Sequence, residues 1–152
     1  MIHSPLSVDR SSKESSGEFA SYVDLRVWHA SIDLAEMVYE LCKTFPKEEL
    51  FALTLQLKKS AVSISSNIAE GCARNGSKEF IQFLGIASGS LAELRTQIII
   101  AKRVKLCTDE AASSLEEKII VVSKMLAGLR RSIRTIQNPP STENEQRTTE
   151  NT

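Results

Sequence analysis

The stretch "FIQFLGIASGSLAELRTQIIIA", Phe80 to Ala101, decides the fold. Apolar residues recur in it at alternating spacings of three and four: Phe80, Leu84, Ala87, Leu91, Leu94, Ile98 and Ala101. An α-helix has 3.6 residues per turn, so this spacing places all of them on one face. The stretch therefore predicts a long amphipathic helix, with Ser77 as its N-cap.

Three further segments show the same periodicity. Residues 24–45 carry the stripe Leu25, Trp28, Ile32, Ala35, Tyr39 and Cys42. Residues 47–72 carry Leu50, Leu53, Leu57, Ala61, Ile64 and Ile68. The last helix is expected from Thr108, with Leu115, Ile119, Val122, Leu126, Leu129, Ile133 and Ile136 facing inward. The expected boundaries are an N-cap at Ser21 or Asp24, a stop before Pro46, a C-cap at Gly71 and an N-cap at Thr108.

Four such helices joined by short turns predict an all-α protein, an antiparallel up-down-up-down four-helix bundle. We expect one bundle domain over residues 21–137. Residues 1–20 and 138–152 are polar and lack periodicity, so they are expected to be disordered tails. The 152-residue chain is long enough for one core.

Composition and charge narrow the range of functions. The formal net charge is zero, although residues 24–136 hold 16 Lys and Arg against 13 Asp and Glu. The three cysteines are Cys42, Cys72 and Cys107, an odd number that favours free thiols in a reducing compartment. No segment is apolar over the length of a membrane span, and no signal peptide is visible, so we expect a cytoplasmic protein with no membrane partner.

The residues needed for catalysis or for a cofactor are missing from the pattern. Di-iron bundles need inward glutamates and Glu-x-x-His pairs, whereas this chain has only His3 and His29. The cysteines are too dispersed for zinc, and no serine has a histidine partner other than His29. The glycines of "GIASGS", Gly85 to Ser90, lie within a helix and lack the lysine of a phosphate loop. We expect no enzyme activity, no cofactor and no metal.

A second set of residues is small and polar. The stretch "SISSNIAEG", Ser63 to Gly71, lies in a helical segment, and Gly85 and Gly89 lie in the next one. Glycine within a helix costs about 1 kcal/mol relative to alanine, which suggests a packing reason. We interpret these residues as a structural packing motif that allows close helix contact, in which Asn67 and Glu70 also bind backbone N–H groups at the following turn: Ser63, Asn67, Glu70, Gly71, Gly85 and Gly89. A catalytic role for Glu70 is the weaker interpretation, because it has no partner carboxylate.

Basic residues supply the remaining candidate surface. A solvated face is the simpler interpretation, and a phosphate-contacting surface is the functional one. The candidate nucleic-acid contacts are Lys58, Lys59, Arg74, Lys78, Lys102, Arg103, Lys105, Arg130, Arg131 and Arg134.

Two stretches carry a resemblance to a known family: "FPKEELFALTLQLKKSAVSISSNIAEG", Phe45 to Gly71, and "EFIQFLGIASGSLAEL", Glu79 to Leu94. The chain resembles the 23S rRNA intervening sequence proteins over residues 24–136. The matching positions include Ser63, Asn67, Glu70, Gly71, Gly89, Ser90 and Glu93. The resemblance implies a homopentameric four-helix bundle with no known catalytic residues. Its fold is similar to that of the accessory protein of diversity-generating retroelements, a basic pentamer that binds nucleic acid and partners a reverse transcriptase.

We therefore expect a non-enzymatic oligomer that binds structured RNA or DNA through basic residues of several subunits, and the family resemblance implies that this oligomer is a homopentamer. The alternative is a protein–protein adaptor or scaffold with no nucleic-acid role, whose partner would be a protein such as a reverse transcriptase.

Overall fold

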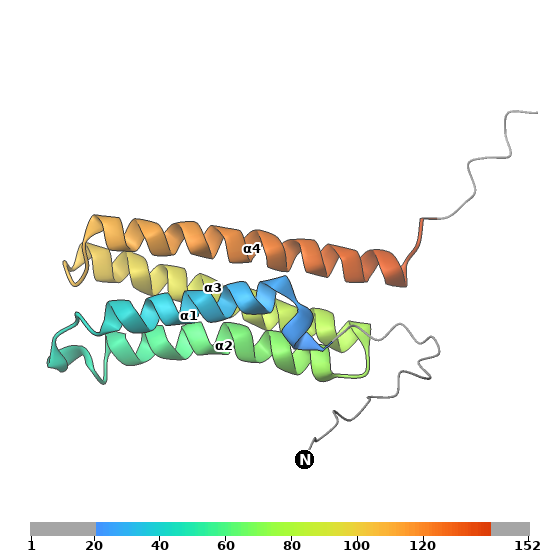
Figure 1. The fold of residues 1–152 in the computed structure, drawn as a ribbon, viewed down its shortest axis with the longest axis horizontal. Helices are drawn as coiled ribbons and strands as arrows, with labels where there is room; N and C mark the ends of the chain where they lie inside the picture. Colours follow the sequence, from blue (N-terminus) through green and yellow to red (C-terminus); the bar gives the residue numbers. More distant parts are fainter. Residues whose placement is uncertain (1–20, 141–152) are drawn as a thin grey trace, which may run out of the picture.

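The computed structural model describes residues 21–140, which fold into four long α-helices and two single-turn 3-10 helices. The long helices are α1 (Arg26–Cys42), α2 (Leu53–Ala73), α3 (Ser77–Arg103) and α4 (Asp109–Gln137), and the short ones are η1 (Tyr22–Asp24) and η2 (Lys47–Glu49). The four long helices lie alongside one another (Figure 1). The α1–α2 and α3–α4 connections lie at the left end of that view, and the α2–α3 turn lies at the right end. This all-helical arrangement confirms the predicted class of fold.

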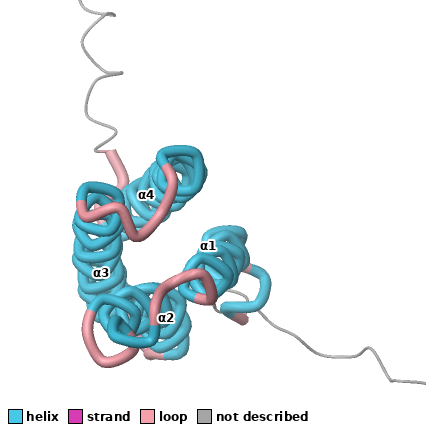
Figure 2. Tube along the Cα trace, turned by 90° about the vertical axis from the view of Figure 1, so that its left-hand side faces the viewer, coloured by secondary structure: helices cyan, strands magenta, loops and turns pink. Residues whose placement is uncertain are grey.

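The helices surround one core. Viewed along the bundle, they follow the order α1, α2, α3, α4, and each packs against its chain neighbours (Figure 2). Helix α4 also contacts α1. The stripe predicted for α3 is buried in full, from Phe80 at 2% exposure to Ala101 at 0%. Most of the stripes predicted for α2 and α4 are buried as well, with Leu50 and Ile136 as exposed exceptions.

The face predicted for α1 was wrong in part: Cys42 is buried, and Leu25, Trp28 and Ala35 are only partly buried against the core. The residues that enter the core are Val27, Ala30, Ser31, Leu34, Val38, Leu41 and Cys42. Tyr39, which the periodicity predicts inside, is 44% exposed. Two adjacent apolar stripes run along α1, and the one with smaller aliphatic side chains is the one that packs inside. Trp28 is left at the edge, where its ring contacts the Tyr22 ring edge-on at 5.2 Å.

The expected helix ends hold in part. The Thr108 side chain caps α4 by accepting a hydrogen bond from the Ala111 N–H at 3.1 Å, as predicted. Helix α1 begins after Leu25, with no capping side chain, and ends three residues earlier than predicted. Gly71 lies inside α2, which continues to Ala73, and the N-cap of α3 is Gly76. The predicted tails lie outside the described residues, except for 138–140.

Helix α3 ends in a Schellman motif. The Leu106 N–H donates to the Ala101 carbonyl at 2.9 Å, and the Lys105 N–H donates to the Lys102 carbonyl at 3.2 Å. Lys105 adopts φ of 66°, the left-handed conformation that glycine usually supplies at this position. A lysine therefore stands at the sharp turn into α4, at some conformational cost.

Candidate nucleic-acid interface

Charge is distributed unevenly along α4. Its first third carries Asp109, Glu110, Glu116 and Glu117, and the chain has no further carboxylate between residues 118 and 140. The rest of α4, from residue 118 to its end, is here called the basic half of α4. It holds five cations: Lys118, Lys124, Arg130, Arg131 and Arg134. The basic half of α4 extends over about 30 Å at 1.5 Å per residue. Helix α4 thus combines an acidic beginning with an exclusively basic end.

Three of these cations point to solvent on one side of the helix. Lys124, Arg131 and Arg134 are all exposed. Positions seven and three residues apart lie on the same face of an α-helix, so their charges can act together on one ligand. The C-terminal end of a helix also favours cations because of its dipole. Part of this clustering therefore has a purely structural cause.

Arg130 is held differently. It is only half-buried, yet its Nε is enclosed and has no hydrogen-bond acceptor among the described residues. Its guanidinium lies over α3 at Gly85, where an added Cβ would come within 3.9 Å of a terminal nitrogen. The side chain is therefore folded against the neighbouring helix, whereas Arg131 and Arg134 are exposed.

The turn between α2 and α3 adds cations at the same end of the molecule. Figure 1 places this turn and the end of α4 together at the right. Lys78 is exposed, while Arg74 donates to a Glu70 carboxylate oxygen at 2.8 Å and lies over the Phe83 ring at 5.3 Å. Arg74 is thus partly engaged within the protein, and Lys78 is the more available charge.

The remaining predicted nucleic-acid contacts lie elsewhere. Lys102, Arg103 and Lys105 belong to the opposite end, about 36 Å from Lys78 along α3. In the first third of α2, Lys58 lies over the Tyr39 ring at 4.8 Å and Lys59 is exposed. One chain therefore does not bring all ten predicted cations onto one surface, and Lys124 was not among the ten predicted nucleic-acid contacts.

The predicted packing motif lies between α2 and α3. The Ser63 and Ser90 hydroxyls are 2.7 Å apart across the two helices. Within α2, the Asn67 amide donates to the Ser63 carbonyl at 2.7 Å and to its hydroxyl at 3.0 Å. A second link joins the helices one turn away, where the Ser60 hydroxyl donates to the Gln97 amide oxygen at 3.0 Å. Hydroxyl and amide groups thus satisfy one another along this contact.

The glycines of the motif differ from one another. A Cβ on Gly71 would lie 2.5 Å from the Phe83 Cβ, so α2 and α3 approach closely there. A Cβ on Gly89 would meet nothing within 4 Å, and one on Gly85 would meet only Arg130. The expectation that Gly85 and Gly89 permit close contact within the bundle was therefore wrong. The role expected for Asn67 and Glu70 was also wrong, because Asn67 bonds to Ser63 and Glu70 to the Arg74 side chain rather than to backbone N–H groups of α3.

The cysteine thiols have raised pKa values. Burial raises the pKa of Cys42, with a smaller opposing effect from the Lys58 charge. Burial likewise raises the pKa of Cys72 and of Cys107, where the Asp109 charge adds to the effect and Lys102 opposes it. A raised pKa leaves less nucleophilic thiolate near neutral pH.

Other reactive groups are held by backbone carbonyls. The His29 Nε2 donates to the Val23 carbonyl at 2.6 Å, and the Ser31 hydroxyl donates to the Trp28 carbonyl at 2.6 Å. Between residues 21 and 140, no three His, Cys, Asp or Glu side chains are grouped as metal ligands. None of the helices in this range combines the length and apolar character needed to cross a bilayer.

The fold and its packed core define a four-helix protein whose most distinctive surface is the basic half of α4. The family model for the 23S rRNA-intervening sequence protein matches residues 23–128. The chain therefore belongs to the 23S rRNA intervening sequence protein family. The match begins in η1 and ends within α4, so it covers the greater part of all four helices.

A solved structure supports the fold. It is the crystal structure of a protein of unknown function from the S23 ribosomal protein family of Bacteroides thetaiotaomicron. That protein is 24% identical to this chain, and the match covers 69% of this chain and 98% of that one, with a TM-score of 0.65. A search of curated proteins finds no match.

Proposed function

We propose that this protein is a non-enzymatic, self-assembling helical bundle that binds the phosphate backbone of structured RNA or DNA. The observation that carries the proposal is the charge of α4, which has five cations and no carboxylate over residues 118–140. Lysine and arginine bound to phosphates release condensed counterions, which makes binding favourable and salt-dependent. With few exposed aromatic side chains at this end, backbone contact is favoured over base stacking.

Self-assembly would enlarge this basic surface. The net charge of one chain is zero, so one copy offers only a small cluster. Several copies with their α4 ends side by side would present repeated sets of Lys124, Arg131 and Arg134. The antiparallel helix order and the pentamer implied by the family resemblance belong to this proposal. The positions of the connections in Figure 1 are consistent with that helix order.

The outer face of α3 supports contact between copies. Ile86 is 53% exposed and Ile100 is 45% exposed, and they lie four helical turns apart on this face with Gly89 between them. A helical glycine costs about 1 kcal/mol, and Gly89 gains no packing inside its own chain. A second copy packed against this face would bury both isoleucines and use the space at Gly89.

The nucleic-acid proposal is tested by fluorescence anisotropy with a hairpin RNA and a matched hairpin DNA at two salt concentrations. Arg131→Gln/Arg134→Gln should weaken binding and reduce the salt slope by about one for each phosphate that the variant no longer neutralises. The matched control is Lys43→Gln/Lys47→Gln, which removes the same charge near the other end of the bundle. If both variants weaken binding equally, the effect comes from the net charge of the protein and not from the basic half of α4. Absence of binding by the intact protein at low salt would refute the proposal.

Light scattering tests self-assembly separately. A pentamer would have five times the 16.8 kDa mass of one chain. Ile86→Lys/Ile100→Lys should reduce that mass, because charges would be buried unpaired in the contact. The control is Leu55→Lys/Val62→Lys on α2, at similar exposures of 42% and 43%. A wild-type mass equal to one chain would refute assembly.

A further inference from the structure

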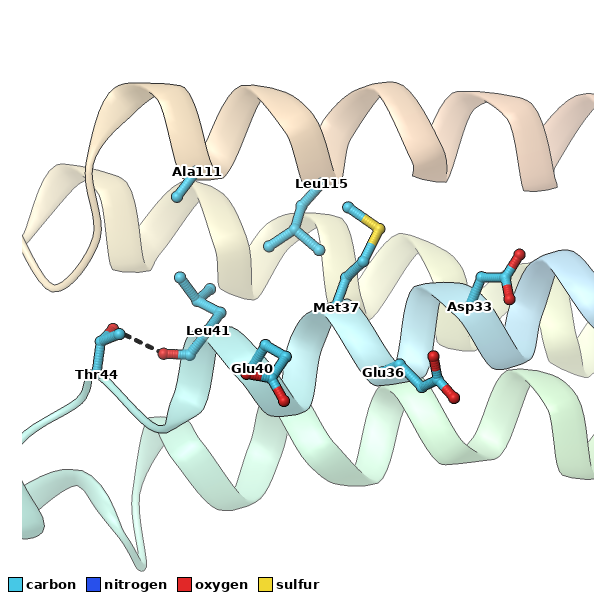
Figure 3. Close-up of a pocket in the computed structure, with 8 residues that line it drawn as sticks. All are labelled: Asp33, Glu36, Met37, Glu40, Leu41, Thr44, Ala111 and Leu115. Atoms are coloured by element: carbon cyan, nitrogen blue, oxygen red, sulfur yellow. Dashed lines mark hydrogen bonds between the residues drawn. The ribbon is translucent and has the colours of Figure 1, made fainter.

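A groove separates α1 from α4 near the end where α1 finishes and α4 begins. It has a volume of about 570 Å³ and is lined by Asp33, Glu36, Met37, Glu40, Leu41, Thr44, Ala111 and Leu115. Figure 3 shows the Met37, Leu41 and Leu115 side chains directed into the space between the two helices. None of the basic residues considered above lines this groove. It is thus a second surface, which meets the basic half of α4 at the ion pair between Asp33 and Lys118.

The floor of the groove is apolar and continuous with the core. Leu115 is 2% exposed and Leu41 is 9% exposed, so their buried sides are already fixed by core packing. Met37 is half-buried, and its unbranched thioether side chain can adapt to different partner shapes. An apolar floor on a rigid support can accept apolar side chains without refolding of the bundle.

The rim of the groove is acidic along α1. Asp33, Glu36 and Glu40 occur at spacings of three and four, so their carboxylates form one edge over two helical turns. Asp33 accepts from Lys118 at 3.3 Å, and Glu40 pairs with Lys43 at 2.6 Å. Glu36 has no ion pair in the part of the chain that the structure describes, which leaves it available to a partner.

Nearby charges strengthen the negative potential. Asp109 and Glu110 begin α4 at this end, and the C-terminal end of the α1 dipole is also negative. The pair between Glu40 and Lys43 is 69% exposed on both sides, so it is weak and readily exchanged for another cation. Phosphates would be repelled here, whereas lysine and arginine would be attracted.

The length of the groove indicates the form of its ligand. Asp33 and Thr44 at its two ends are eleven residues apart, which corresponds to about 17 Å or three helical turns. A helix of that length with apolar residues at i, i+4 and i+7 would place them on the floor. Basic residues on its flank would then face the acidic edge of α1.

From this combination we infer that the α1–α4 groove is a docking site for a short basic amphipathic helix of a partner protein. The apolar face of that helix would cover Met37, Leu41 and Leu115. Its lysines or arginines would bind Glu36 and Glu40. The inference is independent of nucleic-acid binding, because it uses different residues and the opposite charge.

The probe is a fluorescent synthetic peptide of about three helical turns, with leucines on one face and lysines and arginines on the other. A matched peptide carries glutamate in place of each basic residue. Titrated with the full-length protein, the basic peptide should bind with a Kd of about 100 μM or tighter, and the acidic one at least about tenfold more weakly. Equal affinities for both peptides, or no binding of either, would overturn the inference.

Two variants locate the binding. Glu36→Lys/Glu40→Lys should weaken the basic peptide by at least about tenfold, since it reverses the rim. Glu48→Lys/Glu93→Lys makes the same change in net charge outside the groove and should bind like the wild type. Similarly weakened binding by both variants would assign the affinity to overall charge and overturn the inference.

The mass of the groove variant separates a foreign helix from a second copy of this chain. Light scattering on Glu36→Lys/Glu40→Lys should give the wild-type mass. A lower mass would make the groove a contact between copies and overturn the docking of a partner. Circular dichroism of the same sample checks that the exposed substitutions leave the helices intact.

Discussion

Replacing Gly71 by alanine tests a close approach between two helices, α2 and α3. The added Cβ would lie 2.5 Å from the Phe83 Cβ and 3.0 Å from the Phe80 Cδ2. Carbon atoms in favourable contact are about 3.5–4.0 Å apart, so the distance between the added Cβ and the Phe83 Cβ must increase by about 1 Å. The Phe83 Cβ is bonded directly to the backbone and cannot rotate away. Helix α3 must therefore move away from α2, or the substituted turn of α2 must bend.

The magnitude follows from two opposing effects. Overpacking a core costs about 1–3 kcal/mol, and the clash with a fixed atom places Gly71→Ala in the upper half of that range. Replacing a helical glycine by alanine raises the free energy of unfolding by about 1 kcal/mol through the higher helix propensity of alanine. Gly71 has no positive φ, so no backbone strain enters. The expected result is a decrease of about 1–2 kcal/mol in the free energy of unfolding.

Gly128→Ala is the matched control. An added Cβ at Gly128 meets nothing within 4 Å, so only the helix propensity changes. This variant should gain about 1 kcal/mol, and the two substitutions should have opposite signs. Urea unfolding followed by circular dichroism at fixed protein concentration measures both, since the stability of an oligomer depends on concentration. A Gly71→Ala protein as stable as the wild type would refute the close contact.

Four other substitutions or treatments have defined outcomes. Thr108→Ala should destabilise the protein by about 1 kcal/mol in urea unfolding, because α4 loses its N-cap, while Thr108→Ser should retain most of the stability. Lys105→Gly should stabilise the protein by about 0.5–1 kcal/mol in the same assay. Glycine removes the conformational cost of the positive φ, and the greater freedom of glycine in the unfolded chain offsets part of that gain. Cys42 should react with a thiol reagent far more slowly than after unfolding in urea, and labelling should quicken as pH rises. Because burial raises its pKa, the contribution of Cys42 to stability is present below the ordinary thiol pKa and is lost as pH rises above it, as urea unfolding at pH 8 and pH 10 would reveal.

The sequence predicted the buried faces of α3 and α4 because the apolar stripe of each helix is long and regular, from Phe80 to Ala101 and from Leu115 to Ile133. In α1 two stripes compete, and the periodicity alone favours the wrong one. Leu34 and Val38 are fully buried in the core, while Tyr39 is 44% exposed. Which stripe packs depends on the shape of the other three helices, and that information is not local.

Glycine is similarly ambiguous as a signal. Gly71 suggests a helix end, because glycine is common there, but it serves a close helix contact. Gly89 suggests a close contact, yet it faces open space on α3. The α1–α4 groove was not predicted, since it depends on how far apart the first and last helices lie. The only sign of the groove in the sequence is a row of acidic residues at spacings of three and four: Asp33, Glu36 and Glu40.

The two proposed sites should function independently, which can be tested in one experiment. Along α4, Leu115 and Arg131 are sixteen residues apart, or about 24 Å. The Debye length at physiological ionic strength is about 8 Å, so Arg131 and Arg134 are largely screened from the groove, although Asp33 on its rim pairs with Lys118 of α4. The bundle thus carries separate acidic and basic regions, and the zero net charge of the chain also includes the charges of residues 1–23 and 137–152. Arg131→Gln/Arg134→Gln should leave the affinity for the basic peptide unchanged within about twofold, and saturating peptide should leave hairpin binding unchanged by the same measure. A mutual effect of about tenfold or more would mean that the regions meet in the assembly, because reciprocal coupling requires a shared contact or conformational change.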